Sequence, residues 1–124
     1  MSLDVAKNVE RLKEIKNLCF DWNGYGANAF SDNLIDKCEK IINRLVVQPS
    51  IHPTGRNSIQ FEYRLDDGSY LEFEIFEDKI LCLEVPKRNY SDAITLIITN
   101  FDDDAINKII NDFYKKGVCS KYEN

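Results

Sequence analysis

The sequence predicts an α+β domain in which two N-terminal helices and one C-terminal helix pack on one face of a four-stranded antiparallel meander. Apolar residues recur at spacings of three and four on either side of a glycine-containing loop, which is typical of amphipathic helices. Residues 59–75 instead alternate apolar and polar side chains, and residues 93–99 are rich in β-branched types, as strands are. At 124 residues, the chain is expected to form a single domain over residues 1–124.

The first two helices form a predicted antiparallel hairpin. The first helix is expected over residues 3–19, and residues 20–30 break its pattern with two glycines. Ser31 is expected to cap the second helix, because its hydroxyl can accept a hydrogen bond from an unpaired amide of the first turn. Pro49 should end this helix by about Val47.

The register of the first strand hairpin follows from the rule that facing residues lie on the same side of a sheet. A two-residue loop at Asp67-Gly68 would pair Tyr63 with Glu72 and place a carboxylate in the core. A three-residue loop at residues 66–68 pairs Tyr63 with Leu71 and puts a glycine where the backbone must be left-handed. We therefore predict the three-residue loop.

The same reasoning predicts a three-residue loop at residues 77–79, which places Phe73 opposite Leu83 and Leu71 opposite Val85. Lys79 would then take the left-handed position, where glycine would be less costly.

Residues 93–99 are predicted to form the fourth strand, although Ser91-Asp92 could instead cap a short helix there. The last helix should begin at Asn100 or Asp102 and stop at Gly117.

The net charge of −5 resides in residues 49–85, which hold 3 basic and 8 acidic side chains (3 − 8 = −5), while the rest of the chain balances. Under the predicted register, three glutamates lie side by side on the outer face of the sheet and a fourth lies in the next row: Glu62, Glu72, Glu84 and Glu74. Facing like charges destabilise a sheet by roughly a few tenths of a kcal/mol. One interpretation is therefore that the row binds a basic partner protein or a metal ion. The alternative is a solvated face whose charge is offset by nearby basic residues.

Two loops are further candidates for binding. Trp22 and Tyr25 could form an aromatic recognition loop, or Trp22 could close the end of the helical hairpin against the sheet. His52 and Arg56 belong to a glycine-containing turn over residues 52–58 that could hold an anion in a backbone nest, or could simply align the first strand.

Several function classes lack support in the sequence. The negative charge argues against direct nucleic-acid binding, and no apolar run approaches the roughly 20 residues that a membrane span needs. The four cysteines form no CxxC pair, so we expect reduced thiols in a cytoplasmic protein. The run 102–104 is better explained as a helix cap than as a metal site. We assign no catalytic residue, cofactor or metal, and the absence of catalytic motifs favours a protein that is not an enzyme.

The loop at residues 22–27, the turn at 53–55 and the acidic strands at 59–63 and 71–75 occur together. This combination resembles a family of small uncharacterised bacterial and phage-associated proteins with a WNGYGA loop and a PTG turn before an acidic hairpin. The resemblance covers about residues 12–76. It implies an accessory or mobile-element setting, and no known activity, cofactor or catalytic residue.

Two functional hypotheses follow. The first is a non-enzymatic protein-interaction module of the antitoxin, immunity-protein or defence-inhibitor type, which presents the acidic sheet face to a basic partner. The second is a small-molecule-binding protein or enzyme with a pocket near Trp22, Tyr25 and the 52–58 turn. Whether the fourth strand leaves an edge free to form a homodimer stays open at this point.

Overall fold

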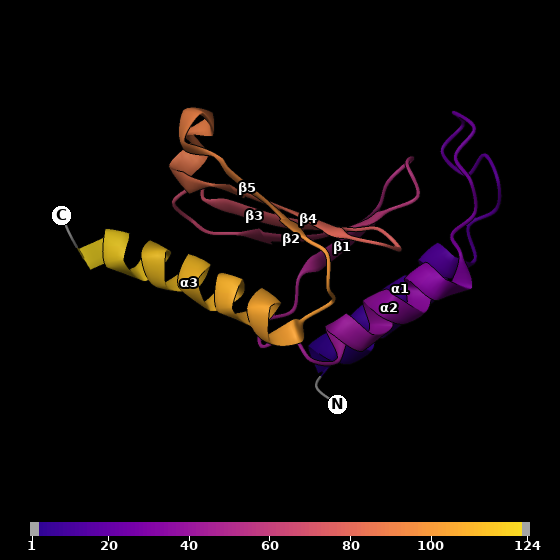
Figure 1. Cartoon of the computed structure of the whole chain (residues 1–124), viewed down its shortest axis with the longest axis horizontal. Coiled ribbons are helices and arrows are strands. Elements are labelled where there is room, and N and C mark those ends of the chain that lie inside the picture. Colours follow the sequence, from indigo (N-terminus) through magenta and orange to yellow (C-terminus); the bar gives the residue numbers. More distant parts are fainter. Residues whose placement is uncertain (1–2, 123–124) are drawn as a thin grey trace.

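The computed structural model describes residues 3–122, with side chains through residue 116. It confirms an α+β fold in which the helices lie on one face of an antiparallel sheet, but the sheet has five strands (Figure 1). The strands follow chain order, β1-β2-β3-β4-β5, so β1 and β5 are the two edges. The elements are α1 (Leu3–Lys16), α2 (Asp32–Ile42), β1 (Ser50–Pro53), β2 (Ile59–Arg64), β3 (Tyr70–Ile75), β4 (Ile80–Val85), the short 3₁₀ turns Pro86–Arg88 and Tyr90–Asp92, β5 (Ile94–Ile98) and α3 (Asp103–Tyr122).

The strand that the sequence analysis missed is β1, which pairs Ile51 with Phe61 of β2. It is four residues long, it contains Pro53, and only Ile51 is buried. So short a segment has no alternation that could distinguish it from a turn.

The helices begin as expected and end differently. The Ser31 hydroxyl accepts a hydrogen bond from the Leu34 amide at 3.1 Å, which confirms the predicted cap of α2. However, α1 and α2 end at Lys16 and Ile42, earlier than predicted, and α3 continues past Gly117. A glycine inside a helix costs only about 1 kcal/mol, so it does not by itself stop one.

The first strand hairpin has the predicted register. Tyr63 faces Leu71, and the Leu65 amide donates to the Ser69 carbonyl at 3.0 Å, which leaves a three-residue loop. Gly68, the last loop residue, has φ of +87°. The predicted need for a left-handed residue at this position is therefore confirmed.

Replacing Gly68 by alanine should lower the free energy of unfolding by about 1–2 kcal/mol, the cost of a left-handed L-residue. A β-carbon there would also lie 2.8 Å from Cγ of Arg88. Gly55→Ala is the matched control, because the φ of Gly55 is not positive and its nearest neighbour would be the flexible Asn23 amide at 3.0 Å. Urea denaturation measures both variants, and equal losses would contradict this explanation.

The predicted register of the second hairpin is wrong by one residue. The Phe76 amide donates to the Lys79 carbonyl at 2.9 Å, so the loop is the two residues Glu77-Asp78, and Lys79 has no positive φ. Phe73 therefore faces Cys82 rather than Leu83. The pattern favours the wholly apolar set Leu81, Leu83 and Val85 for the core, because the other set contains Glu84, yet the structure turns Ile80 and Cys82 inward.

The core lies between the sheet and the helices. The helices contribute buried aliphatic and aromatic side chains, among them Leu12, Ile15, Leu34, Ile41, Ile42, Ile106, Ile110 and Phe113. The facing side of the sheet contributes Ile51, Ile59, Phe61, Tyr63, Leu71, Phe73, Ile75, Ile80, Cys82 and Ile98. The other face of the sheet carries no helix, so its side chains form the surface on which a partner could act (Figure 1).

Candidate functional site

Two of the predicted acidic residues do meet on the outer face, and they share an internal partner. Glu62 and Glu72 face each other across β2 and β3. The Tyr70 hydroxyl lies between the two carboxylates, 3.0 Å from that of Glu62 and 2.6 Å from that of Glu72, so its single proton is shared between them. Burial, and then the hydrogen bond to Glu72, raise the pKa of Tyr70 above its ordinary value, so its hydroxyl stays a donor. The hydroxyl between the two carboxylates offsets part of their electrostatic repulsion.

Glu62 has further partners of its own. His52 Nε2 and an Arg64 terminal nitrogen each lie 3.5 Å from one of its oxygens. Within the described part of the chain, Glu72 forms no ion pair and is held only by the Tyr70 hydroxyl. Glu72 is therefore the carboxylate of this pair that lacks a basic partner.

Glu84 does not belong to the row, contrary to the prediction. The one-residue change in register places it opposite Leu71 and Ile94, on the face that carries the helices. There its carboxylate forms an ion pair with Lys116 of α3, at 3.1 Å. The predicted line of three glutamates therefore does not exist.

Glu74 lies on the outer face but is only 4 % exposed. The Arg56 guanidinium binds its two oxygens, one of them at 2.7 Å, and the Ser58 hydroxyl donates to it at 2.5 Å. These bonds, that of Arg56 first, hold the pKa of Glu74 below its ordinary value despite burial. Arg56 therefore anchors the 54–58 turn to the sheet, and its charge is already committed to a carboxylate.

This ion pair should make stability sensitive to acid. Because the pKa of Glu74 is lower in the folded state, its contribution is fully present at neutral pH and is lost as the pH falls below about 4.5. Glu74→Gln should therefore be less stable than wild type at pH 7, and the difference should shrink at low pH. Unfolding free energies measured from pH 7 to pH 3 check this, and a constant difference between the two proteins would contradict it.

The corrected register gives the outer face an apolar half. Leu83 faces Glu72, and Leu81 faces Glu74 and Ile97, so both leucines lie on the side away from the helices. They border a depression of about 630 Å³ whose lining comes from β3, β4 and β5: Glu72, Glu74, Leu81, Cys82, Leu83, Thr95, Leu96 and Ile97. The predicted register places Leu83 in the core and therefore does not indicate this surface.

The two edges of the sheet differ. At β1 the Arg11 side chain donates to the Ile51 carbonyl at 3.2 Å, and Pro53 interrupts the strand, so this edge is protected. Strand β5 contains neither proline nor a charged residue. On this strand Ile97, which pairs with Leu81 and is exposed, extends the apolar half of the outer face to the rim of the sheet. Ile94 and Leu96 are also exposed, but they pair with Glu84 and Cys82 and lie on the face that carries the helices.

The loop with Trp22 and Tyr25 has a structural role, and it does not form the predicted pocket with His52. The Trp22 ring lies 5.9 Å from that of Phe30 and its indole donates to the Asn28 carbonyl, as expected if Trp22 closes the helical hairpin. Tyr25 is 91 % exposed, and His52 lies on β1 beside Glu62.

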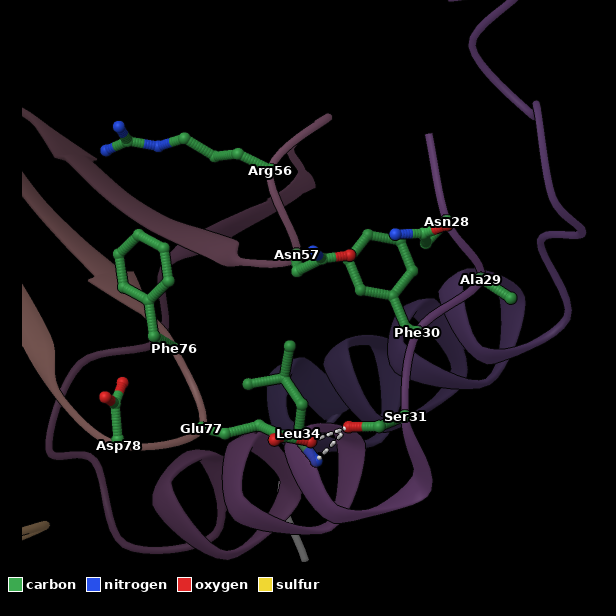
Figure 2. Close-up of a pocket in the computed structure, with 10 residues that line it drawn as sticks. All are labelled: Asn28, Ala29, Phe30, Ser31, Leu34, Arg56, Asn57, Phe76, Glu77 and Asp78. Atoms are coloured by element: carbon green, nitrogen blue, oxygen red, sulfur yellow. Dashed lines mark hydrogen bonds between the residues drawn. The ribbon is translucent and has the colours of Figure 1, made fainter. Parts of the chain in front are cut away.

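A separate pocket of about 600 Å³ opens beside this loop (Figure 2). Of the predicted ligand-binding residues, only Arg56 lines it. Its lining comes from three segments of the chain: Asn28, Ala29, Phe30, Ser31, Leu34, Arg56, Asn57, Phe76, Glu77 and Asp78.

The other candidate features have structural explanations. Asp102 Oδ1 accepts a hydrogen bond from the Asp104 amide at 3.0 Å, which confirms its role as a helix cap. Among the described residues, no group of three His, Cys, Asp or Glu side chains could hold a metal ion. Cys19, Cys38 and Cys82 are free thiols, and Cys119 lies outside the described side chains. Burial raises the pKa of Cys82 to about 12, so it is a poor nucleophile.

No protein-family model, curated protein or solved structure matches this chain. The resemblance noted from the sequence therefore stays a prediction. None of the described helices is both long and apolar enough to cross a membrane.

Proposed function

We propose that the protein is a non-enzymatic interaction module whose outer sheet face binds a basic, amphipathic helix of a partner protein. One observation carries the proposal: Glu72, which has no basic partner in the described part of the chain, lies beside a depression lined by Leu81, Leu83 and Ile97. A surface that combines an unpaired carboxylate with exposed aliphatic groups is complementary to a segment with both basic and apolar side chains.

The spacing of the strands supports a helical partner. Glu72, Leu83 and Thr95 form one row across β3, β4 and β5, and neighbouring strands are about 5 Å apart. Side chains three or four positions apart on a helix are separated by about 5–6 Å. A helix laid across the strands can therefore place a lysine or arginine over Glu72 and apolar residues over Leu83 and the rim of β5.

This partner differs from the one expected from the sequence. The row of Glu62, Glu72 and Glu84 suggested a purely electrostatic surface, but Glu84 is on the opposite face and Glu62 has its own partners. Apolar contact therefore supplies most of the proposed affinity, and Glu72 sets the preference for a positive charge.

The test uses a leucine–lysine amphipathic peptide of about 18 residues, or five helical turns. Its matched control has glutamate in place of every lysine. We expect saturable binding of the lysine peptide in fluorescence anisotropy, weakened by salt, and none of the glutamate peptide. Glu72→Gln should weaken binding about two- to fivefold, as loss of one exposed charge pair does, while Glu39→Gln on α2 should not.

Three results would overturn the proposal. The first is equal binding of both peptides, and the second is equal loss from the two glutamine variants, because either would show non-specific attraction to a protein of net charge −5. The third is a concentration-dependent dimer in sedimentation equilibrium that the lysine peptide does not disrupt, because it would show that a second copy covers this surface.

A further inference from the structure

The pocket in Figure 2 is built from three segments that are far apart in the sequence. They are the segment entering α2, the turn between β1 and β2, and the tip of the β3–β4 hairpin. Ser31 donates to the Glu77 carboxylate, and Lys37 donates to the Glu77 carbonyl, so the hairpin tip is tied to α2. These contacts fix the position of the hairpin tip relative to the start of α2.

Part of the pocket wall is aromatic and aliphatic. Phe30 and Leu34, both buried, form one side, and Phe76 from the end of β3 lies across the cavity (Figure 2). The Trp22 ring packs against Phe30, at a centroid distance of 5.9 Å. Aromatic and aliphatic side chains of this kind make favourable contacts with planar rings.

Two side-chain amides line the same cavity without hydrogen-bond partners in the described part of the chain. They belong to Asn28 and Asn57, and Figure 2 shows both on the Phe30 side of the pocket. Asn57 has φ of +62°, a left-handed conformation that asparagine tolerates better than most residues. Each amide offers a donor and an acceptor side by side, the pattern that pairs with the edge of a nucleobase.

The charges around the pocket favour an uncharged ligand. Arg56 is bound to Glu74, and both Arg56 and Lys79 lie against the ring of Phe76, about 5 Å from its centre. The carboxylates of Glu77 and Asp78 offset these cations. Glu77 is also bonded to Ser31, the cap of α2, so a phosphate would meet a carboxylate at this helix N-terminus.

We propose that this pocket binds an uncharged nucleobase or nucleoside, with the base held between Phe30 and Phe76 and its edge read by Asn28 and Asn57. The volume of about 600 Å³ lies within the range of small-molecule sites. This site shares no lining residue with the depression on the outer sheet face, so the two proposals can be tested independently.

The test is saturation-transfer NMR and calorimetry with adenosine, guanosine, cytidine and uridine at millimolar concentration. Benzyl alcohol is the control for an aromatic ring without a base edge, and the matching nucleotides are the control for charge. We expect saturable binding of at least one nucleoside, weaker binding of its nucleotide, and no saturable binding of benzyl alcohol.

Variants then assign the site. Asn28→Ala and Asn57→Gly, the latter chosen because glycine accepts the left-handed backbone, should each weaken nucleoside binding about fivefold, the loss of roughly one hydrogen bond. Asn111→Ala on the exposed side of α3 should leave binding unchanged. Melting temperatures confirm that each variant is folded. The proposal is overturned if no nucleoside binds, if nucleotides bind more tightly, or if all three variants bind alike.

Discussion

Ile97→Lys should abolish binding of the lysine peptide, with an affinity loss of more than about tenfold, and leave the fold intact. Ile97 is 64 % exposed on β5, so its replacement removes little core packing. The new ammonium group would lie at the rim of the depression next to Leu81, its cross-strand neighbour. There it would repel the basic face of the peptide and remove an apolar contact. Anisotropy titration and circular dichroism measure the two effects.

Asn111→Lys is the matched control, because it adds the same charge at an exposed position of α3, on the side of the sheet away from the proposed binding surface. Its affinity for the peptide should be close to that of wild type. If both lysine variants weaken binding equally, the peptide responds only to net charge, and β5 is not part of the binding surface.

Phe73→Ala should cost about 3–5 kcal/mol of unfolding free energy, the range for a phenylalanine truncated in a close-packed core. Phe73 is 1 % exposed, faces Phe61, and meets Tyr63 edge-to-face at 6.4 Å. Leu83→Ala should cost only about 1 kcal/mol, because Leu83 lies on the outer face and is already partly exposed. Urea unfolding provides both values.

The comparison tests the register directly. If Leu83 faced Phe73, as the alternation of β4 first suggests, Leu83→Ala would cost about 2–5 kcal/mol as in other cores. A loss of that size at Leu83 would restore the sequence-based register and with it the row of glutamates.

The two hairpins show what local sequence can predict. Between β2 and β3 a single glycine and strict alternation leave one register that keeps carboxylates out of the core, and the structure has that register. Between β3 and β4 the wholly apolar set Leu81, Leu83 and Val85 predicts a core-facing side, but the structure turns the other set, Ile80 and Cys82, inward, and this choice depends on packing that local sequence does not contain. Because the predicted register was wrong by one residue, it placed Glu84 on the outer face and Leu81 and Leu83 in the core, the reverse of the structure.

The candidate sites were harder to predict for the same reason. Glu74 and Arg56 were both selected from the sequence, but as members of separate sites, whereas they bind each other across 18 residues. The pocket of Figure 2 joins segments about 20 residues apart or more, and no motif in any one of them indicates it. The α+β class, the first hairpin and the cap at Ser31 depend on neighbouring residues and were predicted correctly, and Asp102 is one of the two predicted starts of the last helix.

Methyl NMR of the complex with the lysine peptide tests the central claim most directly. Leucine and isoleucine methyl groups report separately on the two faces of the sheet. We expect the resonances of Leu81, Leu83 and Ile97 to shift on titration, while those of Leu71, Ile75 and Ile80, which face the helices, stay in place. Shifts confined to the helix side, or to residues of α1 and α2, would contradict the assignment of the outer sheet face as the binding surface.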